Sequence, residues 1–333
     1  MALEQKMKFP LHGLKRISMP HPVKPMLASL ADQSFDGEGW VFEIKFDGYR
    51  TIGEIKNSNV EIYSRNNISF NSRFGSIVRS LKEIKTNAIL DGELVVLDKD
   101  GVSRFQLLQN YNQRQEGNLT YFVFDLLYLK EYDLRGLPLI ERKNLLKEII
   151  PAVSNIKYSD HIEEKGRSFF SLCKKKGLEG IIAKKANSIY YSGQRSKEWL
   201  KIKTHKRQEA VIAGFTKGRG GRKYFGALVL GIYENGRFIY IGHTGGGFTE
   251  KSLAEVTHKL LPLIQQKSPF HEVPKTNMPV QWIKPELVCE VEFQEWTKDG
   301  HMRVPIFMGL REDKLAREVK RENPIPALKT DGK

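Results

Sequence analysis

Hydrophobic and polar positions alternate with period two over several short segments of the first two hundred residues. Between Trp40 and Asp47, the apolar side chains Phe42, Ile44 and Phe46 fall on one face of an extended chain. Such alternation predicts a strand with one buried face. Similar patterns predict further strands at residues 59–65, 88–97, 121–129, 180–184 and 199–203.

Apolar residues at helical spacing appear between these strands. Residues 139–150 carry leucine and isoleucine at intervals near one helical turn, and residues 169–178 are expected to form a second short helix. Asp91-Gly92-Glu93 interrupts the pattern of residues 88–97, which is therefore a bulged strand or a pair of strands. The first two hundred residues predict an α+β domain with mostly antiparallel sheets.

The pattern changes after Thr204–Arg207, where the expected strands become rich in glycine. Asn235-Gly236 predicts a hairpin, because both central positions of a type I′ turn require positive φ. A helix is expected at 249–264. Strands are expected at residues 210–215, 227–233, 237–242 and 287–296. This combination suits a small all-β barrel of the oligonucleotide-binding type.

These patterns give the expected domain organisation. Residues 1–24 are basic and contain several prolines, so they are expected to form an N-terminal arm. The α+β domain is expected to cover residues 25–204, and the barrel residues 205–333.

Composition narrows the class of protein. The chain has 333 residues, with 54 Lys or Arg against 39 Asp or Glu, which is a formal net charge of +15. Such an excess of cations attracts polyanions, nucleic acid first. Apolar runs stay well below the roughly 18 residues that span a bilayer. Because Cys173 and Cys289 cannot build a disulfide framework, we expect an intracellular protein rather than a membrane or disulfide-rich secreted one.

The strongest local motif is Glu43–Arg50, with the sequence EIKFDGYR. Lys45 becomes a nucleophile once its ammonium loses a proton, and a metal ion or neighbouring cations favour that loss. Gly48 would let the backbone approach a ligand closely. Taken alone, the motif is better explained as a surface strand end, because Lys-x-Asp-Gly should occur by chance in about one protein in ten of this length.

Further short motifs follow it in order along the chain: Ser64-Arg65-Asn66, Asp91-Gly92-Glu93, Phe124-Asp125, Glu179–Lys184, Trp199–Lys203 and Arg311–Lys314. This ordered set resembles the collinear motifs of the covalent nucleotidyltransferases, which include ATP-dependent DNA ligases, RNA ligases and mRNA capping enzymes. The segments that most resemble the ligase domain of bacterial ligase D, a nonhomologous end-joining ligase, are Lys45–Arg50, Tyr121–Leu129, Asp133–Leu139, Glu295–Thr297 and Phe307–Lys314.

The resemblance implies an ATP-dependent DNA ligase that seals nicks or ends in duplex DNA, in repair by end joining. It also implies a nucleotidyltransferase, or adenylation, domain followed by an oligonucleotide-binding barrel, in agreement with the boundary predicted near residue 205. Asn67 stands where related ligases usually carry glycine after Ser-Arg-Asn. Because asparagine tolerates the left-handed region, the turn is expected to survive.

The resemblance assigns Lys45 as the nucleophile that attacks the α-phosphorus of ATP and forms a lysyl-AMP. Glu43 is expected to accept from the adenine amino group. Phe124 is expected to stack on adenine, and an ordinary core phenylalanine is the competing interpretation. Arg50 and Glu93 resemble the ribose contacts. The implied cofactor-binding residues are Glu43, Ile44, Lys45, Arg50, Arg65, Glu93, Phe124, Lys201 and Lys203.

A divalent cation, Mg²⁺ or Mn²⁺, is also implied, with Glu93 and Glu179 as its ligands, since such hard ions prefer carboxylate oxygens. Lys201 and Lys203 share one strand face by period two, so both can point at the same phosphate.

Arg65 resembles a contact to the AMP phosphate or to the 5′-phosphate of the nick. The alternative for Arg65 is a surface ion pair with Glu61 or Glu54. Asp47 is expected to orient the metal or the attacking 3′-hydroxyl.

The motif near the end of the chain lies on the expected barrel. In the resembling family it closes over the active site and orients the departing pyrophosphate, because phosphoryl-type transfer depends on positioning and electrostatics. The expected catalytic residues are Lys45, Asp47, Arg311, Asp313 and Lys314.

Two other functions stay open at this point. An RNA ligase or a GTP-using capping enzyme belongs to the same superfamily, and the Glu295–Thr297 and Arg311–Lys314 segments count against it. A non-catalytic nucleic-acid-binding module is disfavoured by the intact Lys45 and Glu179. The expected partners are nicked duplex DNA and a Ku-like end-binding protein. We expect a monomer in the bacterial cytoplasm, at the nucleoid, without membrane association.

Overall fold

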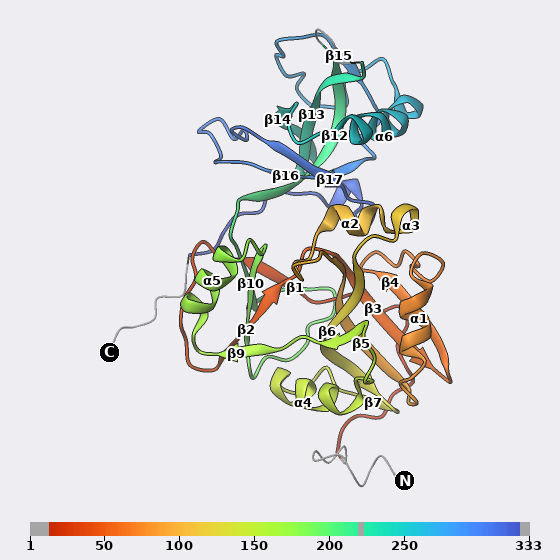
Figure 1. Ribbon diagram of the computed structural model, residues 1–333. Coiled ribbons are helices and arrows are strands. Elements are labelled where there is room, and N and C mark those ends of the chain that lie inside the picture. The colour runs from red at the N-terminus through yellow and green to blue at the C-terminus, as the bar shows by residue number, and fades with distance from the viewer. Residues whose placement is uncertain (1–12, 219–222, 327–333) are drawn as a thin grey trace. The chain divides into compact units, whose positions relative to one another are not determined.

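The computed structural model describes residues 13–218 and 223–326 of the chain. Contacts divide the chain into a first unit, Met1–Thr204 with Pro324–Lys333, and a second unit, His205–Asn323. Figure 1 shows the helices and strands of each unit. Of the expected arm at residues 1–24, residues 1–12 lie outside the described part of the chain.

The first sheet of the first unit has the strand order β1-β11-β10-β2-β9 and is antiparallel apart from the β1–β11 pair. Its strands are β1 (Leu27–Leu30), β2 (Trp40–Lys45), β9 (His161–Glu163), β10 (Gly180–Lys185) and β11 (Arg195–Lys203). Lys45 lies opposite Gly180, which in turn lies opposite Lys203. Because residues opposite one another project from the same face, this row belongs to one side of the sheet.

The other side of the first sheet is apolar. Phe42, Ile181 and Ile202 are buried there, with Ile44 partly buried beside them. Helix α5 (Gly166–Lys175) covers this side and contributes the buried Cys173. The alternation of residues 40–47 thus predicts correctly that Phe42 and Ile44 share an apolar side, but the opposite side of β2 is buried as well, at Val41 and Glu43.

The second sheet has the order β4-β3-β5-β6-β7, and β8 joins β6 in parallel. Its strands are β3 (Tyr49–Lys56), β4 (Asn59–Ser64), β5 (Ala88–Leu97), β6 (Asn118–Leu129), β7 (Tyr132–Asp133) and β8 (Ile156–Tyr158). The β5–β6 register shifts between Asp91 and Gly92, so residues 88–97 form a bulged strand. Asn67, after β4, has φ of 61° and adopts the expected left-handed turn.

The remaining helices of the first unit are α1 (Gly75–Leu81), α2 (Phe105–Gln109), α3 (Tyr111–Arg114) and α4 (Leu139–Ile149). Ile77 of α1, Leu108 of α2 and Leu146 of α4 share one core cluster with the second sheet.

A different core cluster lies between the two sheets. Val41 and Trp199 contribute to it from the first sheet, and Ile52, Ile89 and Phe124 from the second. The polar side of the first sheet therefore faces the second sheet. Lys45 and its neighbours lie on this side, at the end of β2.

The second unit is built on a sheet with the order β14-β13-β12-β16-β17, and β15 pairs with β12. Its elements are β12 (Arg207–Lys217), β13 (Phe225–Glu234), β14 (Arg237–Thr244), α6 (Glu250–Leu260), η1 (Leu261–Leu263), β15 (Val280–Trp282), β16 (Val288–Glu292), β17 (Ile306–Leu310) and η2 (Ala316–Glu318). A parallel bridge between Gly246 and Ile306 links the segment after β14 to β17. The two outer strands of the sheet thus approach each other, as a barrel requires.

Local sequence signals explain several boundaries in this unit. Asn235 and Gly236 have φ of 50° and 77°, as the predicted type I′ turn requires. Thr249 caps α6 through a capping box with Ser252. The expected helix at 249–264 is α-helical only to Leu260, and Pro262, which lacks an amide donor, lies in the short 3₁₀ turn that follows.

The end of the described chain differs from the expectation that residues 205–333 form one domain. Residues from Pro324 onward group with the first unit. Ile325 forms a parallel bridge with Ala31, its N–H donates to Leu30 O at 2.8 Å, and its side chain packs against the apolar core beside α5. The segment therefore adds to the β1 edge of the first sheet.

Candidate active site

Lys45 occupies the last position of β2, and its Nζ donates to Glu179 Oε1 at 2.5 Å. The Lys45 side chain is 20% exposed and that of Glu179 is 4% exposed. Glu179 immediately precedes β10, whose first residue, Gly180, lies opposite Lys45. Neighbouring antiparallel strands thus bring the predicted nucleophile to a predicted metal ligand.

Gly180 is required for this geometry. Its φ is +152°, and a Cβ at this position would lie 2.1 Å from the Ile202 carbonyl oxygen. The Glu179 carbonyl accepts from the Thr204 N–H at 2.9 Å. The close approach of β11 therefore fixes the backbone that carries Glu179.

Lys201 and Lys203 extend the polar face of the first sheet on β11. Lys203 lies in the row of Gly180 and Lys45, and Lys201 lies in the row of Glu43. Both lysines are half-buried. Three cationic side chains on one face can bind a phosphate chain, as period two predicts.

Glu43 lies in a buried ion cluster that the sequence does not reveal. Its carboxylate is 2% exposed, and it accepts from Lys143 Nζ at 2.6 Å and from Lys184 Nζ at 2.8 Å. Burial raises the pKa of Glu43, but Lys143 and Lys184 outweigh this effect and hold it below its ordinary value. Burial lowers the pKa of Lys184 to about 8, against the attraction of Glu43.

Phe124 is buried, and cations lie over its ring. Lys184 Nζ is 4.1 Å and Arg50 Cζ is 4.5 Å from the ring centroid. Arg50 donates to both carboxylate oxygens of Asp91 at 2.6 Å, and Asp91 also accepts from the Tyr190 hydroxyl at 2.5 Å. The predicted contacts of Phe124 with adenine and of Arg50 with ribose remain predictions.

Glu93 and Arg65 lie on the second sheet and directly after it. Glu93, on β5, lies opposite Arg50 on one side and Phe122 on the other, and is half-buried. Arg65 directly follows β4 and is also half-buried. Both positions are compatible with their predicted ligand contacts, which stay predictions.

Ile44 and Asp47 are the remaining predicted site residues of the first unit. The Ile44 side chain packs on the apolar side of the first sheet, opposite to Lys45, so only its backbone can serve a nucleotide. The Asp47 N–H donates to Ser103 Oγ at 3.1 Å, which ties the turn after β2 to the segment before α2. The Asp47 carboxyl is half-buried near the nucleophile.

The motif near the end of the chain forms a separate charged cluster in the second unit. Arg311 donates to both oxygens of Asp313 at 2.9 Å and lies 3.5 Å from Glu290. Lys314 Nζ lies 2.8 Å from Glu209 Oε1. Burial raises the pKa of Glu209, but Lys314 and Arg311 outweigh it and bring the pKa to about 2. Arg311 and Lys314 are thus held by carboxylates of β16 and β12, and Asp313 is held by Arg311.

No role is predicted for Lys143, or for Lys184 at the end of the Glu179–Lys184 motif, although a signal exists for each. Lys184 follows Gly180 and Ile182 at period two, so it shares the face of Lys45. Lys143 follows Leu139 by four residues, so it lies on the buried side of a helix and is itself 0% exposed.

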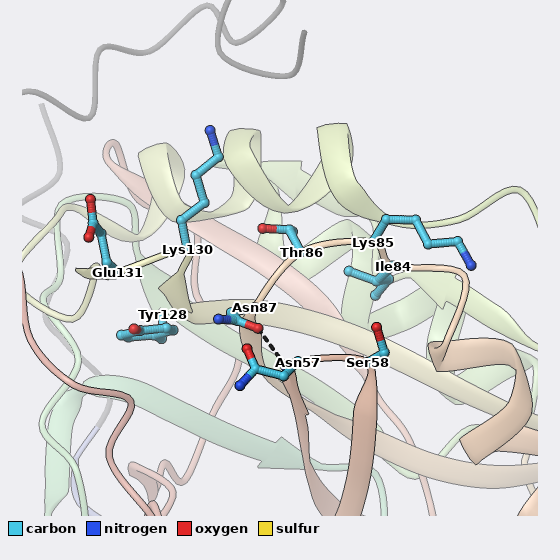
Figure 2. Close-up of a pocket in the computed structure, with 9 residues that line it drawn as sticks. All are labelled: Asn57, Ser58, Ile84, Lys85, Thr86, Asn87, Tyr128, Lys130 and Glu131. Carbon is cyan, nitrogen blue, oxygen red and sulfur yellow. Dashed lines mark hydrogen bonds between the residues drawn. The ribbon is translucent and has the colours of Figure 1, made fainter. Parts of the chain in front are cut away.

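One hollow of the first unit lies at the opposite end of the second sheet, where the β3–β4 turn meets the end of β6 (Figure 2). It has a volume of about 570 Å³, and the predicted site residues do not line it. Its lining residues are Asn57, Ser58, Ile84, Lys85, Thr86, Asn87, Tyr128, Lys130 and Glu131.

Among the described residues, His21, Glu54 and Glu61 form a group whose potential metal-ligand atoms all lie within 4.8 Å of one another. His21 Nδ1 lies 2.8 Å from Glu54 Oε2. Glu93 and Glu179 do not belong to this group. The metal site predicted at Glu93 and Glu179 therefore stays a prediction.

An α+β unit with a lysine at the end of β2, a glutamate paired with it before β10, and lysines on the same face of β11 is the arrangement expected of a covalent nucleotidyltransferase. The sequence matches the family described as ATP dependent DNA ligase domain over residues 25–203. It also matches the ATP dependent DNA ligase C terminal region over residues 221–314. The chain belongs to the ATP-dependent DNA ligase family. Its two-part fold is the adenylation domain and oligonucleotide-binding domain of such ligases.

Similar proteins include multifunctional non-homologous end joining protein LigD of Pseudomonas aeruginosa, 40% identical over 315 residues. This match covers 92% of the chain and 37% of that protein. A DNA ligase-like protein LigB of Bacillus subtilis is 29% identical, and the match covers 87% of the chain and 99% of that protein. The solved structure of a mycobacterial DNA ligase D complexed with ATP and MES is 33% identical, with a TM-score of 0.67 over 90% of the chain and 98% of that structure.

The chain thus spans about 37–40% of the length of the LigD relatives it matches. Within the described residues, every helix is too short or too polar to cross a membrane.

Proposed function

We propose that this chain seals nicked duplex DNA, with ATP as the source of a covalent adenylate. The observation that carries the proposal is the Lys45–Glu179 pair at the end of β2, with Lys201 and Lys203 on the same face of the sheet. Such a site would offer one nucleophilic amine beside cationic groups suited to bind phosphate.

The proposed reaction has three displacement steps. The Lys45 amine attacks the α-phosphorus of ATP, so that a nitrogen–phosphorus bond forms and pyrophosphate leaves. The 5′-phosphate of the nick then takes the AMP and releases Lys45. Finally the 3′-hydroxyl attacks that phosphate, a phosphodiester forms, and AMP leaves. Lys45 must lose a proton before the first attack, and this loss ends its ion pair with Glu179.

The carboxylates of Glu93 and Glu179 suit Mg²⁺ or Mn²⁺, because both ions prefer hard oxygen ligands and complete their shells with phosphate oxygens. Such an ion would neutralise charge on the phosphates. We propose that Lys201 and Lys203, which lie on one face of β11, bind phosphate oxygens.

We assign residues 25–204 to the adenylation domain and residues 205 onward to the oligonucleotide-binding domain, with the exception of the segment after Asn323. Arg311, Asp313 and Lys314 are proposed to act on the pyrophosphate. The buried pairs of this cluster support a positioning role, because Asp313 orients the Arg311 guanidinium.

We further propose that the chain works in end joining, as the name of its LigD relatives states for those proteins. A Ku-like end-binding protein, a monomeric state and a location at the bacterial nucleoid belong to the same proposal. The net charge of +15 supports the DNA-binding part of this proposal.

Transfer of label from nucleotide to protein tests the proposed chemistry. The chain is incubated with α-labelled ATP or GTP and Mg²⁺, and the product is separated by denaturing electrophoresis. We expect the protein to become labelled from ATP, and this labelling to be lost in Lys45→Ala. We also expect the unmodified chain to seal a nicked duplex.

Each other outcome counts against the proposal. Label from GTP in preference to ATP would favour a capping enzyme. Absence of label from both nucleotides, in protein first stripped of AMP with pyrophosphate, would exclude a nucleotidyltransferase and leave a nucleic-acid-binding module.

A further inference from the structure

Helix α4 brings two fully buried cations into the first unit. Arg142 and Lys143 are each 0% exposed. Arg142 donates to both oxygens of Asp125, at 2.7 and 2.8 Å, and so ties α4 to β6. Lys143 instead reaches Glu43 on β2, two residues before Lys45. A helix outside the recognised motifs is thus linked to the strand that carries the nucleophile.

The position of the Lys143 ammonium is closely determined. Its Nζ donates to Glu43 Oε1 at 2.6 Å, to Ser159 O at 3.0 Å and to Phe124 O at 3.5 Å. Three acceptors match the three protons of an ammonium. The Tyr158 ring centroid lies 4.6 Å from the same Nζ. These contacts leave Lys143 no access to water, so its charge is balanced by Glu43.

The second oxygen of Glu43 has a different partner. Lys184 Nζ donates to Glu43 Oε2 at 2.8 Å and lies between the rings of Phe124 and Trp199, 4.1 and 4.3 Å from their centroids. Lys143 therefore holds Glu43 from the side of helix α4, whereas Lys184 holds it from the side of the predicted base-binding residue Phe124.

We propose that Lys143 is a positioning residue that keeps Glu43 ionised and oriented, and thereby makes the site select adenine over guanine. The inference rests on the proposed function, because it requires Glu43 to meet the base. Adenine presents an amino donor where guanine presents the O6 acceptor. An ionised carboxylate only accepts hydrogen bonds, whereas a protonated carboxyl also donates. An ionised Glu43 therefore attracts adenine and repels guanine O6.

The selectivity of label transfer tests this role. The kcat/KM for transfer from α-labelled ATP and from α-labelled GTP is measured for the full chain and for Lys143→Met. We expect the ATP-over-GTP ratio to fall by about tenfold or more, the size associated with one hydrogen bond to a charged group. The loss should appear mainly as a higher KM for ATP.

Lys147→Met is the matched control. Lys147 lies one turn further along α4, is exposed, and places its Nζ 4.7 Å from the same Tyr158 ring. Its removal takes away a neighbouring positive charge without changing the contact with Glu43. We expect the ATP-over-GTP ratio of this variant to equal that of the unmodified chain.

A double-mutant cycle separates a positioning role from a structural one. In a Glu43→Gln background, which itself lowers the ratio, Lys143→Met should leave the ratio unchanged, because coupled residues are not additive. Lys143→Gln, which retains a donor, replaces Lys143→Met where thermal melting shows that the latter does not fold.

Failure of the proposed function and failure of the role of Lys143 give different results. Absence of label from either nucleotide in the unmodified chain would overturn the proposed function. Normal transfer from ATP, with the same ratio in Lys143→Met and Lys147→Met, would overturn the role of Lys143 alone. A full ratio in Glu43→Gln would do the same, because Lys143 is proposed to act through Glu43.

Discussion

At the scale of single residues, two of the predicted site residues, Lys45 and Glu43, have defined ionic partners. Lys45 pairs with Glu179, and Glu43 pairs with Lys143 and Lys184. These pairs are largely removed from water, so breaking one leaves an uncompensated charge in a medium of low dielectric constant. The site is therefore organised before any nucleotide binds.

Lys203 allows a prediction about this organisation. Lys203→Met removes a cation from the row of Lys45 and should lower the rate of lysyl-AMP formation by about 100-fold, the usual cost of one electrostatic contact to a transition state. Label transfer from α-labelled ATP measures this rate. Lys197→Met, an exposed position on the same strand, is the control and should keep the normal rate. Equal rates of lysyl-AMP formation in the two variants would show that Lys203 does not act in the site.

At the scale of elements, short strands position the predicted site residues, because the register between neighbouring strands brings these residues side by side. The sequence alternation of β2 and β11 is sufficient to predict which side chains share a face. It does not predict β1 or β15, because four and three residues are too few for a periodic pattern. Strand β17 (Ile306–Leu310) is not predicted for another reason. Its sequence contains no polar residue whose spacing could reveal an alternation.

The start of β10 is an element boundary at which a substitution should strongly affect stability. Gly180→Ala would place a methyl group 2.1 Å from the Ile202 carbonyl and force a positive φ on alanine. We expect the free energy of unfolding to fall by about 2 kcal/mol or more, and lysyl-AMP formation to fall with it, because Glu179 is displaced. Urea denaturation provides the first measurement and label transfer the second.

Gly136→Ala is the control for this substitution, since a Cβ at Gly136 meets no atom within 4 Å. Its stability should change by less than about 0.5 kcal/mol. If Gly180→Ala and Gly136→Ala have the same free energy of unfolding, then β10 and β11 can move apart to admit the methyl group without loss of stability.

At the scale of the whole molecule, the chain leaves the first unit at Thr204 and returns to it at Pro324. Ile325 then bonds to the β1 edge through Leu30 O, and its carbonyl accepts from the Asp32 N–H at 3.3 Å. An edge strand offers unpaired backbone groups, and these bonds cover part of that edge. The segment after the ligase motifs thus completes the adenylation unit.

Truncation after Asn323 tests this contribution. Hydrogen exchange of peptides covering residues 27–32 should become faster by about tenfold, the change that corresponds to roughly 1.4 kcal/mol of local protection. Peptides of β13 and β14 should exchange at their normal rates. Truncation after Pro326, which preserves the bridge of Ile325, is the matched control, and equal exchange in both truncated chains would contradict the proposed contact.

The sequence by itself determined the class of the protein, because collinear motifs and strand periodicity are local properties of the chain. It indicated Lys45, Glu179, Lys201 and Lys203, whose common face follows from period two and simple strand pairing. Tertiary structure decided what surrounds Glu43. Lys143 is 100 residues away from Glu43 on a helix, and no local pattern records which carboxylate a buried lysine will meet. The return of Ile325 to β1 is non-local for the same reason.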